Sequence, residues 1–157
     1  MTFPAVHPAQ VERLVILVSQ YHERVTSRLL EGAREACRAA AIPDDKVEVI
    51  PVAGAFELGV TAAAAAASGR YDCIIALGAV IRGETPHFDY VAGETARALA
   101  AIATEELIPV GFGLLTTDTL EQAMARAGGA AGNKGREAAE AALQALGAVQ
   151  YLLADDD

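Results

Sequence analysis

The sequence has few aromatic residues and few positive charges. Aromatic side chains make up 5% of the 157 residues and tryptophan is absent, while hydrophobic residues reach 53%. A core of Ala, Val, Leu and Ile is therefore expected, and this mixture suits helices packed on a sheet better than a β-sandwich. The 12 Lys and Arg residues are outnumbered by 21 Asp and Glu residues, giving a net charge of −9. Because no Lys/Arg cluster could neutralise a phosphate backbone, nucleic acid is not the expected partner, whereas a small anionic substrate remains compatible.

Cysteine is also scarce, with Cys37 and Cys73 as its two occurrences. They lack Cys-x-x-Cys spacing and nearby histidines, so we interpret them as small buried hydrophobic residues in a reducing compartment. Residues 1–10 contain prolines and no basic-plus-apolar signal, and the apolar stretches are too short or too rich in alanine and glycine to cross a bilayer. No histidine and carboxylate pair has metal-ligand spacing. We therefore expect a cytoplasmic protein with no bound metal and no membrane association.

Apolar runs alternate with segments of helical periodicity along the chain. Strands are predicted at residues 14–18, 47–52, 72–77 and 110–115. Helices are predicted at residues 23–41, 55–68, 89–107, 118–127 and 136–154. Strand and helix repeated four times with short connections predict an α/β fold, in which a four-stranded parallel sheet lies between two helix layers. The length is most simply that of one domain, residues 1–157, with residues 1–10 as a tail or an extra edge strand.

The most informative stretch is the polar loop that follows the third predicted strand, within residues 78–90. Gly83 would let the backbone come close to a ligand, and the N–H groups around Glu84 and Thr85 could face an anion. His87 is of the residue type that most readily transfers protons near neutral pH. Taken alone, such a loop is more often a surface loop whose histidine only caps the next helix.

Polar and aromatic residues also follow the other predicted strands. The carboxyl ends of parallel strands meet at one edge of a sheet, where ligands bind. Tyr21 and Phe56 could pack in the core or stack on a planar heterocycle. Glu57 could favour a helix dipole or accept hydrogen bonds from hydroxyl groups. Arg126 and Lys134 could be dipole partners or phosphate ligands, and reaching the loop after the third strand would then require a neighbouring subunit.

Two familiar nucleotide motifs are absent. Residues 128–135 resemble a P-loop, but Asn133 separates glycine from Lys134 and no Ser or Thr follows. Gly111 and Gly113 lack the third glycine of a dinucleotide fingerprint and fall inside a predicted strand.

Taken together, six segments resemble the family of 6,7-dimethyl-8-ribityllumazine synthases. The matching segments are residues 54–57, 78–90, 112–118, 121–123, 126–128 and 131–135. The likeness runs in order from about residue 14 to residue 150 with short gaps, so it is highly specific. It implies a flavodoxin-like three-layer α/β/α sandwich. It also implies a cytoplasmic transferase of riboflavin biosynthesis that needs no cofactor.

The resemblance implies a specific reaction and assembly. Family members condense 5-amino-6-(D-ribitylamino)uracil with 3,4-dihydroxy-2-butanone 4-phosphate and release phosphate and water. Their sites lie between adjacent subunits of a pentamer, and in some members pentamers form an icosahedral shell. Small-molecule substrates and other copies of the chain are thus the expected partners, with riboflavin synthase as a further candidate.

The resemblance also assigns roles to individual residues. His87 would move protons. Gly83, Glu84 and Thr85 would bind the phosphate, and Arg126 would close on it from the next subunit. The residues implied for the uracil and its ribityl chain are Tyr21, Ala55, Phe56, Glu57, Val80 and Ile81, with Phe112 and Lys134 contributed by the neighbour.

Departures from the family pattern leave some alternatives open. Tyr21 stands where Phe or Trp is usual, and Ala53 stands where Pro is common. Pro4 and Pro8 lie in a tail that adds a strand to the neighbour's sheet in shell-forming members, and proline cannot donate to a ladder. Residues 128–135 carry no insertion of the kind found in pentamer-only relatives, which slightly favours the shell. The remaining alternatives are a riboflavin- or lumazine-binding paralogue with little turnover, a shell with incidental catalysis, and an unrelated α/β phosphate binder.

Overall fold

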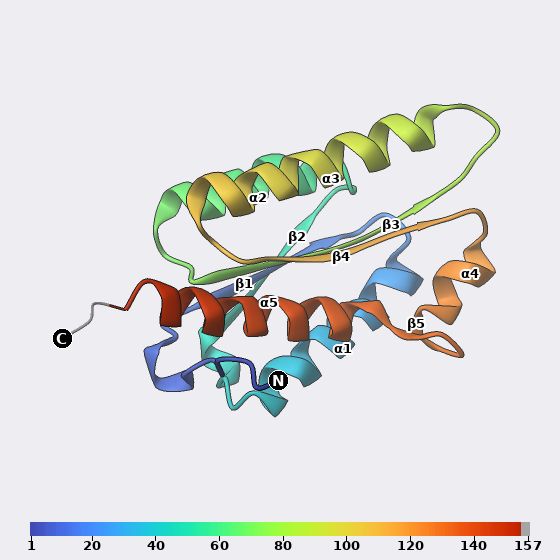
Figure 1. Cartoon of the computed structure of the whole chain (residues 1–157). Coiled ribbons are helices and arrows are strands. Elements are labelled where there is room, and N and C mark those ends of the chain that lie inside the picture. The colour runs from blue at the N-terminus through green and yellow to red at the C-terminus, as the bar shows by residue number, and fades with distance from the viewer. Residues whose placement is uncertain (155–157) are drawn as a thin grey trace.

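The computed structural model describes residues 1–154 and arranges them in three layers (Figure 1). The sheet contains β1 (Leu14–Ser19), β2 (Val47–Val52), β3 (Cys73–Ile81) and β4 (Val110–Thr117). Helices α1 (Glu23–Ala39) and α5 (Lys134–Leu152) cover one face, and α2 (Glu57–Ser68) and α3 (His87–Glu106) cover the other. A short helix α4 (Leu120–Ala125) and a hairpin of β5 (Ala127–Gly129) and β6 (Gly132–Asn133) connect β4 to α5. This confirms the predicted α/β/α fold class.

The four strands are parallel and lie in the order β2-β1-β3-β4. From β1 the chain moves outward to β2 on one side, then returns to β3 on the other side and continues to β4. The strand order therefore reverses between β1 and β3. A crevice outside the carboxyl ends of two such strands is the usual ligand site of an open α/β sheet.

Alternate residues of β1 supply the two cores. Leu14 and Ile16 pack toward α1 and α5, while Val15 and Leu17 pack toward α2 and α3. Both faces are covered, which explains why the strand is a continuous apolar run in the sequence. Cys73 and Cys37 lie in the α1/α5 core with at most 1% of their surface exposed, as the sequence predicted.

Small residues allow the α1/α5 layer to pack closely. A Cβ atom on Gly135 would lie 2.7 Å from Leu29 Cα in α1, and one on Gly111 would lie 2.7 Å from the carbonyl oxygen of Ala138 in α5. Both distances are shorter than a carbon atom tolerates. Gly135 therefore fixes the contact between α1 and α5, and Gly111 fixes the contact between α5 and β4.

The strands that end near the crevice are longer than the sequence predicted. β3 continues to Ile81 rather than ending at residue 77, and β4 continues to Thr117 rather than residue 115. The reason is that Gly78 lies inside the ladder opposite Leu114, where a Cβ atom would be 3.0 Å from Leu114 Cδ1. Glycine in a strand often marks such a close approach rather than the start of a loop.

Several predicted helix boundaries were also wrong. α3 begins at His87, not at residue 89, and α5 begins at Lys134, not at residue 136. α4 ends at Ala125, and its capping box is formed by Thr119 and Gln122 rather than by residues 118 and 121. The glycine-rich break at residues 128–135 contains the β5–β6 hairpin, because Gly128 and Gly132 adopt positive φ angles.

The amino-terminal segment forms a tail and not an edge strand within the described chain. It contains one 3-10 turn, Pro8–Gln10, and packs on α5, where the His7 N–H donates to Gln150 Oε1 at 3.2 Å. A Cβ atom on Gly147 would contact the backbone of this tail. Residues 155–157, interpreted from sequence as a solvated acidic end, lie outside the described residues. No helix within residues 1–154 is long and apolar enough to cross a membrane.

Candidate active site

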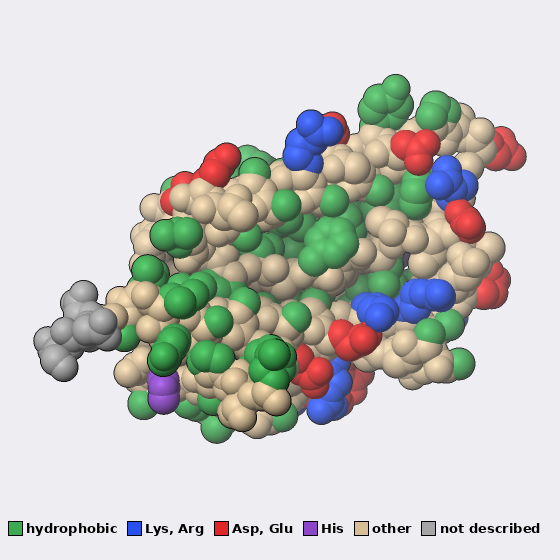
Figure 2. Space-filling view, in the orientation of Figure 1, with side chains coloured by type: hydrophobic (Ala, Val, Ile, Leu, Met, Phe, Trp, Pro, Cys, Tyr) green, Lys and Arg blue, Asp and Glu red, His purple; other side chains and the backbone are tan. Residues whose placement is uncertain are grey.

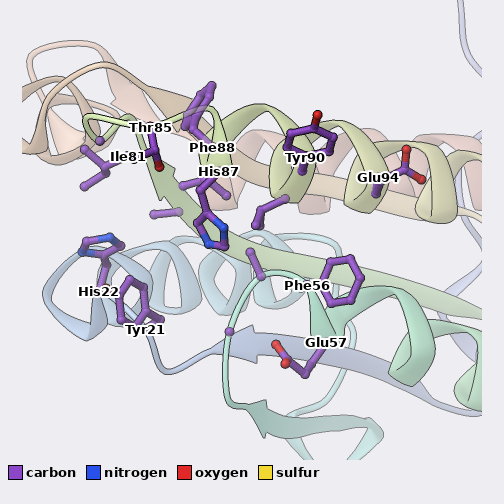
Figure 3. A pocket seen from close by; sticks show the side chains of 16 residues that line it. Tyr21, His22, Phe56, Glu57, Ile81, Thr85, His87, Phe88, Tyr90 and Glu94 are labelled. Atoms are coloured by element: carbon purple, nitrogen blue, oxygen red, sulfur yellow. The ribbon is translucent and has the colours of Figure 1, made fainter.

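A cavity of about 1010 Å³ opens at the carboxyl ends of β1 and β3 (Figure 3). Its walls come from the β1–α1 turn, the start of α2, the end of β3 and the first turns of α3. Nine of the residues predicted for the site line it: Tyr21, Ala55, Phe56, Glu57, Val80, Ile81, Gly83, Thr85 and His87. The topology therefore brings together most of the predicted site from four separate segments.

The β1–α1 turn contributes two rings to the cavity wall. The Gln20 N–H donates to the Val52 carbonyl at 2.8 Å, which holds the turn beside the end of β2. The rings of Tyr21 and His22 meet edge to face with centroids 4.6 Å apart. His22 adopts the left-handed conformation (φ 60°, ψ 50°), which histidine tolerates better than most residues. Burial lowers the pKa of His22 from its ordinary value.

The start of α2 presents an aromatic ring and a carboxylate. Ala55 is buried, and its carbonyl accepts a hydrogen bond from the buried Thr95 hydroxyl of α3 at 3.3 Å. Phe56 is 61% exposed, which leaves its ring free to contact a ligand. A Cβ atom on Gly54 would lie 3.1 Å from Glu57 Oε2, so glycine leaves room for this carboxylate to turn back toward the cavity.

The end of β3 and the loop after it supply backbone groups. Val80 and Ile81 are the last residues of β3 and line the cavity. Gly83 and Thr85 follow them at the rim, and a Cβ atom on Gly83 would meet nothing within 4 Å. Glu84 is exposed and does not line the cavity. A ligand at this rim would meet mostly main-chain atoms and the threonine hydroxyl.

His87 is the first residue of α3, and its ring points into the cavity toward the side where Tyr21 and Phe56 lie (Figure 3). Tyr90, Val91 and Glu94 line the same cavity. They follow His87 by three, four and seven residues, which is the spacing of one helix face. The sequence interpretation missed these three because it began the helix two residues late, although this spacing could have revealed them.

Three predicted residues lie away from the large cavity. Phe112, which is 52% exposed, and Lys134 line a second cavity of about 330 Å³ between β4 and α5. Lys134 Nζ forms an ion pair with Glu137 Oε2 at 3.1 Å. Arg126 lines neither of these cavities, and its Nη1 donates to the Gln122 carbonyl at 3.0 Å. Within one chain, these three side chains therefore do not line the cavity that contains His87.

The β5–β6 hairpin brings two of these residues together. The Lys134 N–H donates to the Arg126 carbonyl at 2.8 Å, so both positive side chains start from adjacent backbone. Figure 2, which faces the β4 edge of the sheet, shows Lys and Arg side chains near the end where Figure 1 places α4 and β5. Hydrophobic side chains gather beside them in the furrow between α3 and α5.

The large cavity suits a planar, partly polar ligand. It has exposed aromatic rings, the carboxylates of Glu57 and Glu94, two histidines and a glycine-containing rim. Within residues 1–154 no group of three or more His, Cys, Asp or Glu side chains could hold a metal ion.

Comparison with known proteins identifies the family. Residues 12–150 match the family model of 6,7-dimethyl-8-ribityllumazine synthase. The chain is 54% identical over 134 residues to the 6,7-dimethyl-8-ribityllumazine synthase of Gemmatimonas aurantiaca, covering 85% of this chain and 82% of the relative. It is 46% identical over 154 residues to the enzyme of the same name from Edwardsiella ictaluri, covering 98% and 99% of the two chains. The fold, the cavity and these matches show that the chain belongs to the 6,7-dimethyl-8-ribityllumazine synthase family.

Proposed function

We propose that this protein is a lumazine synthase. It condenses 5-amino-6-(D-ribitylamino)uracil with 3,4-dihydroxy-2-butanone 4-phosphate to give 6,7-dimethyl-8-ribityllumazine, phosphate and water. The observation that carries the proposal is the large cavity, in which nine residues implied by the family resemblance line one space. Membership of the family supports the same assignment.

The uracil substrate is placed between the two exposed rings of the cavity. Tyr21 and Phe56 flank the heterocycle, and the backbone of Val80 and Ile81 meets its polar edge. Ala55 and Glu57 hold the ribityl chain, with the Glu57 carboxylate accepting hydrogen bonds from its hydroxyl groups. The tyrosine ring serves as well as the usual Phe or Trp, because stacking requires a flat apolar face.

The phosphate of the second substrate is placed at the rim after β3. The N–H groups of Gly83, Glu84 and Thr85, with the Thr85 hydroxyl, donate to its oxygens. Arg126 of a neighbouring copy completes the site with a bidentate guanidinium. This arrangement stabilises the charge that develops as the phosphate leaves.

His87 moves protons during the condensation. The substrate amine attacks the ketone carbonyl, and the new C–N bond forms as the amine gives up a proton and the oxygen accepts one before leaving as water. Phosphate then leaves by elimination, and the second amine closes the ring with loss of a second water. An imidazole can serve as acid and base in successive steps. No serine, cysteine or lysine is among the described residues that line the cavity, so orientation of two bound substrates replaces covalent catalysis.

The active protein is proposed to be a pentamer whose sites lie between adjacent copies. Phe112, Arg126 and Lys134 do not line the large cavity of their own chain, and exposed apolar side chains along the β4 edge support a contact there (Figure 2). Assembly of pentamers into a shell, a cytoplasmic location and riboflavin synthase as a partner are inferred from the family resemblance alone.

The test mixes purified protein with both substrates and follows the absorbance of the lumazine product against a sample without protein. Turnover above that background, strongly reduced in Arg126→Ala, is the expected result. Absence of turnover together with tight quenching of riboflavin fluorescence would overturn the proposal in favour of a flavin-binding paralogue.

A further inference from the structure

Arg82 connects three elements around the rim loop, here defined as residues 83–86. Its N–H donates to the Thr117 carbonyl at 2.9 Å and extends the β3–β4 ladder by one residue. Its Nε donates to Asp118 Oδ1 at 2.9 Å, and its Nη1 lies 3.5 Å from Asp89 Oδ1. Its guanidinium carbon lies 4.4 Å from the centre of the Phe88 ring. One side chain thus touches the segment after β4 and the first turn of α3.

Both anchors of Arg82 are themselves held in place. The Asp118 N–H donates to Gln122 Oε1 at 2.8 Å, within the capped amino terminus of α4. Phe88 packs against the buried α2/α3 core, and its ring points away from His87 in Figure 3. Arg82 immediately precedes the rim loop, and its side chain contacts the first turn of α3, which follows the loop and contains His87. Arg82 therefore connects the two ends of the rim loop.

We propose that Arg82 is a positioning residue that holds the rim loop and His87 in the geometry needed to bind phosphate and transfer protons. This inference rests on the proposed function, because it concerns the same phosphate site. The alternative is that Arg82 binds phosphate directly as a cation. Its fork already contacts two carboxylates and its flat face lies over an aromatic ring, so the guanidinium is engaged on several sides before any ligand arrives.

The contacts of Arg82 are also too exposed to be explained by global stability. About half of its side chain is exposed, as are 61% and 67% of the side chains of Asp89 and Asp118. Exposed ion pairs contribute little to folding. Such weak contacts can still hold a short loop in one conformation. Variants of Arg82 and Asp118 should therefore remain folded.

Replacing Asp118 distinguishes a positioning role of Arg82 from a purely Coulombic one, because the two predict opposite changes in the affinity for phosphate. Asp118→Ala removes a negative charge near the phosphate rim, so a purely Coulombic effect would strengthen binding of inorganic phosphate. Positioning predicts the reverse: Asp118→Ala should weaken inorganic phosphate binding and raise KM for the phosphate substrate about 3- to 10-fold, because Arg82 loses a charge-assisted partner. kcat should fall as well, because His87 follows the same loop.

Two further variants sharpen the result. Asp118→Asn removes the same charge but keeps an oxygen for Arg82 Nε, so it should lie between wild type and Asp118→Ala. Arg82→Lys keeps the positive charge but loses the planar fork, so it should behave like Asp118→Ala. The matched control is Glu121→Gln, which removes an exposed carboxylate from the first turn of α4 and should leave phosphate binding unchanged.

Hydrogen exchange measured on the peptide covering residues 83–90 separates this inference from the proposed function. Faster exchange in Asp118→Ala than in Glu121→Gln, together with weaker phosphate binding, supports the positioning role. Unchanged exchange, or phosphate binding that strengthens in Asp118→Ala, overturns it. A wild-type protein without turnover would reject the proposed function, while exchange in this peptide and inorganic phosphate binding would still decide the role of Arg82.

Discussion

Two cavities lined by the described residues have complementary chemistry: the large cavity beside His87 and the smaller cavity that Phe112 and Lys134 line between β4 and α5. The large cavity contains two histidines, two carboxylates and several aromatic rings, but none of its described lining residues is Lys or Arg. The smaller cavity contains Lys134, which is paired with Glu137, and Arg126 starts from the adjacent backbone; no histidine is among its lining residues. The large cavity can thus move protons and hold a heterocycle, and the small one can supply positive charge.

This difference indicates that the site of one chain is electrostatically incomplete. A leaving phosphate carries negative charge, and backbone N–H groups alone neutralise only part of it. Two carboxylates near the large cavity make an unassisted dianion still less favourable. A second chain that places its β4 and α5 side against the large cavity would supply the missing cations.

The largest expected effect comes from removing His87, the proposed proton carrier of the large cavity. His87→Ala should lower kcat about 100-fold or more, because general acid–base catalysis is lost, with little change in KM. Steady-state kinetics with both substrates measures it. His7→Ala in the amino-terminal tail is the matched control and should behave as wild type. Equal kcat values in the two variants would show that His87 is not the proton carrier.

Removing the charge from the other side should have a smaller effect of a different kind. Arg126→Ala should raise KM for the phosphate substrate about 10- to 100-fold, because charge-assisted hydrogen bonds to phosphate are lost. The effect on kcat should be smaller. Arg70→Ala is the control for loss of one arginine, because Arg70 precedes the amino end of β3 and the large cavity lies at its carboxyl end.

Mixing these two variants tests whether the site is shared. His87→Ala and Arg126→Ala chains are dissociated, mixed in equal amounts and reassembled. Roughly a quarter of the interfaces should then be active, because by chance they combine an intact His87 from one chain with an intact Arg126 from its neighbour. Activity no greater than the average of the separate variants would place both residues in a site within one chain.

The close contact between α1 and α5 can be changed without replacing a side chain that lines either cavity. Gly135→Ala should lower the free energy of unfolding by about 1–3 kcal/mol, because the added methyl overlaps the backbone of α1 at Leu29. Gly93→Ala in α3 is the control: a Cβ atom there meets nothing within 4 Å. Helix propensity alone should make that control more stable by up to about 1 kcal/mol. Urea unfolding of both variants measures the contrast, and equal midpoints would contradict the close α1–α5 contact.

The sequence was most informative where chemistry and topology coincide. Continuous apolar strands predicted the parallel sheet, and residues at their carboxyl ends predicted the wall of the large cavity, including Tyr21, Glu57 and His87. The structure places these three in one cavity because parallel strands end at the same edge. Local patterns were therefore sufficient for this half of the site.

The missed features depend on contacts between distant segments. Gly78 was interpreted as the first residue of the loop after β3, whereas its pairing with Leu114 on β4 keeps it inside the sheet. The role of Arg82 depends on Asp118, 36 residues away, and no local spacing connects them. The position of Arg126 and Lys134 outside the large cavity, in contrast, agrees with the expectation that these residues would need a neighbouring subunit to reach the loop after β3.

The smallest expected effect concerns His22, which lines the large cavity. Burial lowers its pKa, so below pH 6.5 the unfolded chain binds a proton that the folded chain binds less readily. Folding stability should therefore fall as pH decreases from about 6.5 toward the lowered pKa, and His22 should contribute no pH dependence above that range, where both states are neutral.

His22→Asn keeps a residue that tolerates the left-handed conformation but cannot titrate. Urea unfolding at pH 5.5 and 7.5 should show a smaller difference in this variant than in wild type, while His7→Asn should match wild type. If His22→Asn kept the full pH dependence, titration of His22 would not be its source. Burial in the wall of the large cavity would then not be what disfavours the charged form of His22.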